Sequence, residues 1–88
     1  MKLPRCKVRF KRLYDALGEC DFTEVAIDIK RNANPVRTYL HELLHLKHPD
    51  WSETRVMNYE RKTWKRMTYK QAFALGKRLF NRGFEEAE

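Results

Sequence analysis

Two histidines four positions apart, with a glutamate directly after the first, are the residues of this sequence whose types and spacing could do chemistry. They are His41, Glu42 and His45, in the stretch YLHELLHLKHP. Side chains four residues apart leave the same face of a helix one turn apart, so both imidazoles could bind one Zn²⁺ at about 2.0–2.1 Å. Glu42 occupies the position at which the pattern HExxH places a general base. The pattern therefore predicts one catalytic zinc ion, with Glu42 taking a proton from water that the metal activates.

A catalytic zinc site usually has a third protein ligand besides water, and the sequence offers three candidates. Glu53 opens the next predicted helix, and the short connection LKHPDWS could fold that helix back beside the first, so we predict Glu53. Glu60, seven residues later on the same helical face, is an alternative. His48 is another, although three ligands in a row on a straight helix span about 10 Å, so the chain would have to turn back at Pro49.

Length and composition limit the classes of protein to which this sequence could belong. Its 88 residues suffice for one domain. We expect neither a membrane span nor a secretory signal, because no apolar run reaches 18 residues and the start lacks an apolar core. Cys6 and Cys20 form no CxxC pair, so we expect reduced thiols that bind no metal. These features predict a cytoplasmic protein.

The chain is strongly basic, with a formal charge of +7 from 19 Lys and Arg against 12 Asp and Glu. Such an excess attracts nucleic acids and other polyanions over long distances. The cations are spread along the chain rather than gathered in one tail, and no nucleic-acid-binding motif is present. General surface charge is therefore the favoured interpretation, and nucleic acid is a less favoured partner.

The first third of the chain has the pattern of a small sheet. In CKVRFKRLY, Val8 and Phe10 alternate with charged residues, which predicts a half-buried strand. GECDF and EVAIDIK follow as a predicted hairpin. Together they predict a three-stranded, mainly antiparallel sheet. EVAIDIK, directly before the metal helix, is also a candidate for the edge of a cleft that binds an extended peptide by strand addition.

The rest of the chain has helical periodicity. Asn34 and Pro35 are typical of a helix start, and Ser52 is the expected cap of a second helix. TYKQ is a capping box that opens a third helix, which we expect to end with Gly83 as its cap. The predicted buried face of that helix comprises Tyr69, Ala72, Phe73, Leu79 and Phe80. The expected α+β domain, residues 1–88, thus contains a sheet region at 1–33, an active-site helix at 34–48, a second helix at 52–67, a C-terminal helix at 68–83 and an acidic tail at 84–88.

On these residues the sequence resembles the gluzincin metallopeptidases and, more closely, the minigluzincins, a family of minimal soluble zincins of about this size. In these families the HExxH helix is followed by a helix that carries a glutamate ligand, here the stretch SETRVMNYE. The resemblance covers most of the chain. It implies a zinc-dependent peptidase that acts on peptides or proteins, with His41, His45 and Glu53 as metal ligands and Glu42 as general base and acid. It also implies that activity is either low or latent, through self-association or through the acidic tail lying in the cleft.

The sequence departs from the longer gluzincin pattern at one position. That pattern places an aspartate four residues after the ligand glutamate, to orient a histidine, whereas Met57 stands four residues after Glu53. The orienting contact is therefore expected from Asp28, Asp50 or a backbone carbonyl. Tyr59 is the candidate for stabilising the oxyanion.

Two other functions are compatible with the same metal residues. One is a basic nucleic-acid-binding domain in which zinc is structural, and it requires a closed site of four ligands. The other is a scaffold that retains the metal without turnover. Replacement of Glu42 distinguishes them from a peptidase, because it should abolish peptide cleavage yet leave zinc bound.

Overall fold

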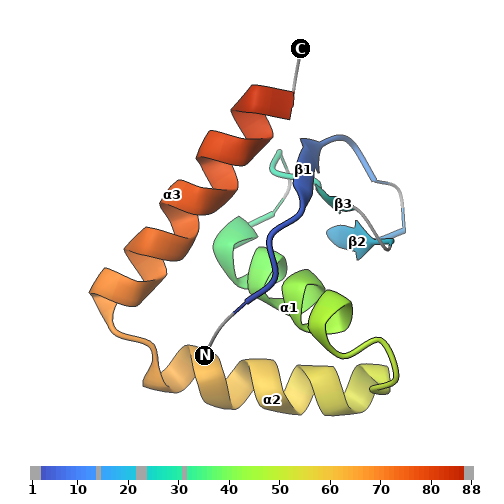
Figure 1. Cartoon of the computed structure of the whole chain (residues 1–88), viewed down its shortest axis with the longest axis vertical. Coiled ribbons are helices and arrows are strands. Elements are labelled where there is room, and N and C mark those ends of the chain that lie inside the picture. The colour runs from blue at the N-terminus through green and yellow to red at the C-terminus, as the bar shows by residue number, and fades with distance from the viewer. Residues whose placement is uncertain (1–2, 14, 22–23, 31, 87–88) are drawn as a thin grey trace.

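A computed structural model of the chain describes residues 3–13, 15–21, 24–30 and 32–86, with side chains described as far as residue 81. The elements are β1 (Lys7–Phe10), β2 (Gly18–Cys20), β3 (Glu24–Ile27), α1 (Pro35–Lys47), α2 (Glu53–Arg66) and α3 (Tyr69–Glu86). Figure 1 shows α1 in the centre, between the sheet and α2, with α3 along the side of β1. The predicted α+β class is confirmed. Within the described residues, no helix is both long and apolar enough to cross a membrane.

The three strands form a mixed sheet in the order β1-β3-β2. β2 and β3 pair antiparallel, with Glu19 opposite Ala26, in agreement with the predicted hairpin. β1 pairs with β3 in parallel, with Val8 opposite Val25, so the description of the sheet as mainly antiparallel is corrected to mixed. Burial explains the order: β3 is buried on both faces, whereas β1 and β2 expose charged side chains and take the edges.

The central position of β3 also corrects the predicted cleft edge. β3 pairs with a strand on each side, so its backbone is not available to an added peptide strand. β2 has one strand neighbour among the described elements and packs against α1. Among the described strands, the edge that borders α1 is therefore β2.

Helix α1 connects the core to the predicted site. Its first turn is capped by Asn34, whose Oδ1 accepts a hydrogen bond from the backbone N–H of Arg37 at 3.1 Å. Leu43 and Leu44, the two variable positions of HExxH, are fully buried, so the histidines on either side of them face outward from the core. The core cluster joins α1 to the sheet and the other helices through Val8, Val25, Ile27, Tyr39, Leu40, Leu43, Leu44, Val56, Leu75 and Leu79.

Helix α2 begins where the sequence predicts. The Oγ of Ser52 accepts a hydrogen bond from the N–H of Arg55 at 3.2 Å, so the second cap is present. Val56 is buried, whereas the neighbouring Met57 is exposed. Among the described elements α2 packs against α1 alone.

Helix α3 differs from the sequence prediction at both ends. The capping box forms, with Thr68 and Gln71 exchanging two hydrogen bonds at 2.9 and 3.1 Å. Tyr69 and Phe73 are nevertheless 97% and 70% exposed, because α3 packs with the face that carries Leu75 and Leu79. Gly83 does not end the helix either, since no described glycine has the positive φ of a left-handed cap and α3 continues to Glu86.

The predicted acidic tail at 84–88 overlaps this longer helix. Its first three residues belong to α3, and the last two lie outside the described residues. Figure 1 shows α3 rising away from α2.

Candidate metal centre

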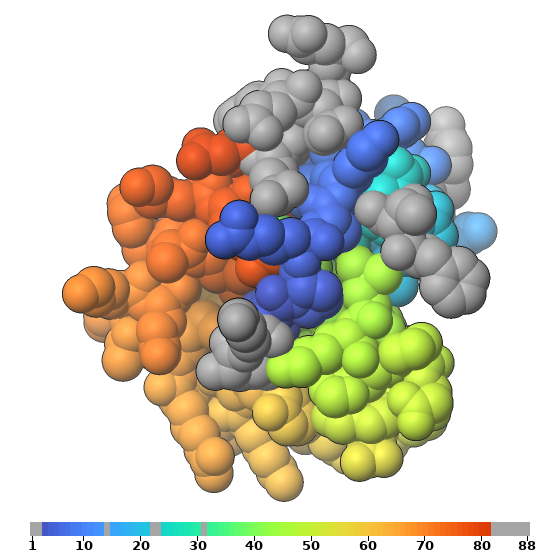
Figure 2. Space-filling model, in the orientation of Figure 1, coloured from blue at the N-terminus to red at the C-terminus, as the bar shows by residue number. Residues whose placement is uncertain are grey.

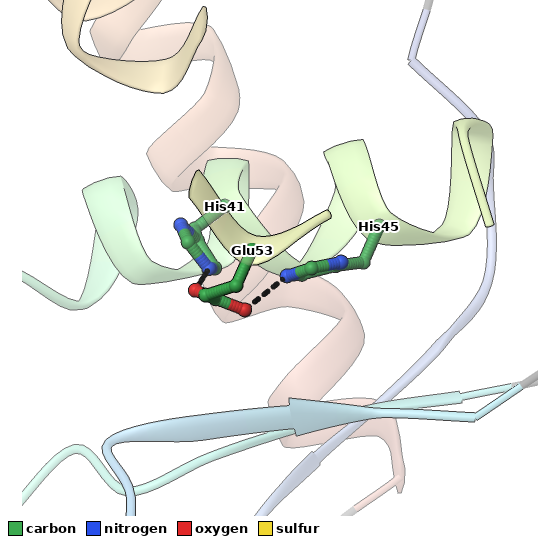
Figure 3. Close-up of side chains that lie close together, drawn as sticks. All are labelled: His41, His45 and Glu53. Atoms are coloured by element: carbon green, nitrogen blue, oxygen red, sulfur yellow. Dashed lines mark hydrogen bonds and ion pairs between the residues drawn. The ribbon is translucent and has the colours of Figure 1, made fainter. Parts of the chain in front are cut away.

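The structure brings together the three residues predicted as metal ligands. Nε2 of His41 lies 2.7 Å from Oε1 of Glu53, and Nε2 of His45 lies 2.8 Å from Oε2 of the same carboxylate. Figure 3 shows the carboxylate of Glu53 between the two imidazole rings. One ligand atom from each residue lies within 4.8 Å of the other two, so the group could hold a metal ion.

The connection between α1 and α2 places Glu53 opposite the histidines. The N–H of His48 donates to the carbonyl of Leu44 at 2.9 Å, and the N–H of Trp51 donates to the carbonyl of His48 at 3.0 Å, which turns the chain sharply after α1. The rings of His48 and Trp51 stack 3.7 Å apart, and the guanidinium of Arg55 covers Trp51 at 4.3 Å. This stack joins the end of α1 to the first turn of α2. It also places His48 outside the metal group.

Glu60 supplies the orienting contact that was expected from Asp28 or Asp50. Its Oε1 lies 3.2 Å from Nδ1 of His41, on the opposite side of the ring from Glu53. Its Oε2 accepts a hydrogen bond from Nε of Arg37 at 2.8 Å. Asp28 instead accepts from the backbone N–H groups of residues 13 and 30. A carboxylate on Nδ1 holds the imidazole so that Nε2 is free to bind a metal.

Sequence reasoning offered Glu60 as a ligand and missed Arg37 altogether. Arg37 stands one turn before His41 on the same helical face, and this spacing is the signal that could have identified it. Tyr59, the predicted oxyanion residue, makes an edge contact with Trp51 at 5.4 Å and does not line the cavity beside the site.

The predicted general base, Glu42, is buried between α1 and β2, with 8% of its surface exposed. Burial raises the pKa of its carboxyl, although His41, His45 and a hydrogen bond with Cys20 act in the opposite direction. Burial also raises the pKa of Cys20 to about 12, and the nearby Glu42 carboxylate adds to this increase. Cys20 therefore carries a neutral thiol at physiological pH.

Glu53 has the opposite electrostatic environment from Glu42. Its slight burial favours a higher pKa, but the charges of His41 and His45 and their hydrogen bonds outweigh this, so the net pKa is lowered. A carboxylate that stays ionised is the form that binds a metal cation. The two glutamates are thus suited to different tasks, Glu53 to ligation and Glu42 to proton transfer.

Two hollows flank the site along the β2 side of α1. The larger, of about 530 Å³, includes His41 and Glu42 in a lining of Leu17, Gly18, Asn32, Ala33, Asn34, Arg37, Thr38, His41, Glu42, Met57, Glu60 and Arg61. The smaller, of about 250 Å³, is lined by Cys20, Asp21, His45, Leu46 and Pro49. The site therefore lies between two recesses that an extended ligand could occupy. We call the larger recess the His41 cavity.

Gly18 permits the close approach of β2 to α1. A Cβ atom at this position would lie 2.6 Å from Cγ2 of Thr38 and 3.1 Å from Cγ of Glu42. Thr38 is held in place by the amide of Asn32, which donates to its Oγ1 at 2.9 Å. Gly18→Ala is therefore expected to push β2 away from α1 and destabilise the protein by about 1–3 kcal/mol. Thermal unfolding measures the change.

Gly76→Ala is the matched control for this prediction. A Cβ at Gly76 meets only Cγ2 of Val36, at an ordinary 3.4 Å, and the position lies inside α3. Alanine there should stabilise the protein by about 0.5–1 kcal/mol, because glycine loses more backbone entropy in a helix. A Gly18→Ala protein as stable as the parent would show that β2 does not pack closely on α1.

No known protein family, curated protein or solved structure significantly matches this chain. The class of site is therefore defined by its own residues: two imidazoles and a carboxylate that could hold a metal ion, with a buried carboxylate beside them. The resemblance to the minigluzincins stays a prediction from the sequence.

Proposed function

We propose that this protein is a zinc-dependent metallopeptidase. The observation that carries the proposal is the convergence of His41, His45 and Glu53 on one point, beside the buried carboxylate of Glu42. Two histidines and a glutamate form one of the ligand sets of catalytic zinc sites, in which the fourth position is left for water or substrate.

The residues fit a zinc ion in three respects. The Nε2 atoms of both histidines lie at 2.7 and 2.8 Å from oxygens of a single carboxylate, so both imidazoles turn the same ring nitrogen toward Glu53. Glu60 holds Nδ1 of His41 and leaves Nε2 for the metal. His48 stacks on Trp51, so the described group has three donors rather than the four of a closed structural site. This last point favours catalytic over structural zinc.

A zinc ion held by His41, His45 and Glu53 would lower the pKa of a water and polarise the peptide carbonyl. Glu42 would accept the proton that is lost as a water oxygen adds to the carbonyl carbon. Glu42 then donates the proton to the leaving amine nitrogen, and the peptide bond breaks. Burial raises the pKa of Glu42 toward neutrality, which suits a group that must both accept and donate a proton.

We expect the substrate backbone to bind beside β2. This strand is short, lies at the edge of the sheet and ends between the two hollows that flank the site. An extended peptide added to this edge would satisfy backbone hydrogen-bonding groups of both chains. Neither Cys6 nor Cys20 forms a disulfide within the described residues, which is consistent with the proposed location in the reducing cytoplasm.

Metal removal and restoration test the proposed function. The zinc-loaded protein should cleave quenched fluorescent peptides from a library of varied sequence, and removal of zinc by a chelator should abolish cleavage. Added Zn²⁺ should restore it, because the metal supplies both the activated water and the polarised carbonyl. Cleavage that survives complete metal removal would overturn the proposal, as would a zinc-loaded protein that cleaves no peptide of the library.

A further inference from the structure

Three cations lie together on α2 next to the His41 cavity. Arg61, Lys62 and Lys65 are all exposed, and their spacing places them side by side on the helical face turned away from Val56. We call these three residues the α2 basic face. Figure 2 shows the yellow-to-orange side chains of α2 projecting from the lower edge of the molecule.

The α2 basic face is not neutralised by the rest of the structure. Among the described residues, none of its three cations takes part in an ion pair. The helix dipole favours cations in the last turn of α2 and so accounts for Lys65. It does not account for Arg61, which stands farther from the helix end and lines the His41 cavity.

In the lining of the His41 cavity, Arg37 and Arg61 formally balance Glu42 and Glu60, so the charge that faces a substrate depends on how these residues are paired. Arg37 is paired with Glu60 at 2.8 Å, so these two charges offset each other. Glu42 is buried against β2 and is assigned to the reaction. Within the described part of the chain, Arg61 is then the cation of the cavity wall that forms no ion pair, and the other two residues of the α2 basic face extend its charge along the helix.

We propose that the substrates are polypeptides that carry aspartate or glutamate on the side of the scissile bond that occupies the His41 cavity. An acidic side chain there would pair with Arg61, and further acidic residues would follow along the α2 basic face. This inference rests on the proposed peptidase function and adds the substrate class. It also gives part of the chain's excess of positive charge a local role, because three cations within residues 61–65 stand on one face of one helix.

The same observations favour a polypeptide over a nucleic acid. Grooves that bind single-stranded nucleic acid combine basic residues with aromatic side chains on which bases stack. On α2, Tyr59 is exposed but its ring makes an edge contact with Trp51, and Trp64 is half-buried. The exposed Tyr69 and Phe73 stand on α3, and no phenylalanine, tyrosine or tryptophan side chain lines the His41 cavity among the described residues. The lining of the His41 cavity instead includes Leu17 and Gly18, and Gly18 belongs to β2, the strand edge that could pair with a peptide backbone.

Peptide binding to the zinc-loaded Glu42→Gln protein tests this inference without turnover. Two fluorescent peptides share an apolar core and differ in three flanking residues, which are acidic in one and lysine in the other. Fluorescence anisotropy should show the acidic peptide binding at least about tenfold more tightly at about 0.05 M salt, and the difference should shrink at about 0.5 M. Arg61→Glu, Lys62→Glu and Lys65→Glu, combined in the same protein, should reverse the preference.

Two controls separate local from general charge. Lys7→Glu, Lys70→Glu and Lys77→Glu, combined in one protein, reverse three exposed cations on β1 and α3 and should leave the preference in place. Arg61→Lys retains the charge and should also retain it. Equal binding of both peptides, or a preference that survives the triple reversal, would overturn the inference.

Failure of the inference and failure of the peptidase proposal are distinguishable. If the parent cleaves acidic and basic peptides equally well, the proposed function stands and the substrate class is wrong. A single-stranded oligonucleotide of the same length provides a third arm. If it binds more tightly than the acidic peptide and is released by the triple reversal, the α2 basic face is a nucleic-acid surface and the inference is overturned.

Discussion

Glu42→Gln is expected to lower kcat for peptide cleavage by about 1,000-fold while the protein retains its zinc. Glutamine has the size of glutamate but cannot accept the proton of the attacking water. The ligand atoms of His41, His45 and Glu53 are untouched, so zinc affinity should change little. Steady-state kinetics and metal analysis of the same preparation measure both quantities. Asp15→Asn, at an exposed position outside the lining of both hollows, is the control and should leave both unchanged.

The pH dependence of stability provides a second measurement on Glu42→Gln. Burial raises the pKa of Glu42 in the folded state, so the folded protein binds its proton more tightly than the unfolded chain does. Between the unfolded and folded pKa values, stability therefore falls as pH rises, and the cost persists above the folded pKa. The metal-free Glu42→Gln protein should accordingly be more stable than the metal-free parent at neutral pH and no more stable in acid.

Either of two results would contradict the assignment of Glu42. Substantial cleavage by the Glu42→Gln protein would show that another group transfers the proton. Loss of zinc from this variant would show that Glu42 is a ligand instead. Thermal unfolding at acid and neutral pH distinguishes a destabilised variant from one that has lost only its proton acceptor.

Glu53→Gln is expected to weaken zinc binding more than Glu60→Gln. Glu53 contacts Nε2 of both histidines, where a metal would lie, whereas Glu60 contacts Nδ1 of His41 from behind. Replacement of a residue that orients a ligand typically costs about 10–100-fold in affinity, and loss of a charged ligand should cost more. Competition with a chromophoric chelator measures the affinity of each protein.

His48→Ala is the control that separates the ligand candidates. His48 stacks on Trp51, so its removal should leave zinc affinity within a few-fold of the parent value. If Glu60→Gln or His48→Ala empties the site while Glu53→Gln does not, the third ligand is misassigned. If none of the three variants loses zinc, the ion is not held by this group.

The features that the sequence predicted well depend on local spacing. Asn34 before Pro35, Ser52, and the TYKQ box each act over four residues, and each makes its expected hydrogen bonds. Helix geometry alone likewise places His41 and His45, which are four residues apart, on the same face of α1. These features needed no knowledge of the rest of the fold.

The features that sequence reasoning missed depend on how distant elements meet. The most apolar strand, β3, takes the centre of the sheet, and β1 pairs with it in parallel. Hydrophobic alternation alone specifies neither the order nor the relative direction of the strands. The position of Glu60 behind His41 depends on the angle at which α2 returns beside α1. The spacing of Tyr69 and Phe73 fits an apolar helix face. However, these two side chains do not pack against β1 or α1, the elements that α3 contacts, and they are exposed.

The sparse packing of α2 has a consequence for the protein in the cell. Among the described elements this helix contacts α1 alone, and its two glutamates meet His41 across that contact. An ion shared between the helices would therefore also fasten one to the other, and part of its binding free energy would be free energy of docking. In a cell short of zinc, α2 would pack less firmly on α1, and the side chains of the proposed site would separate. Metal supply would then affect how long the folded chain survives as well as its chemistry.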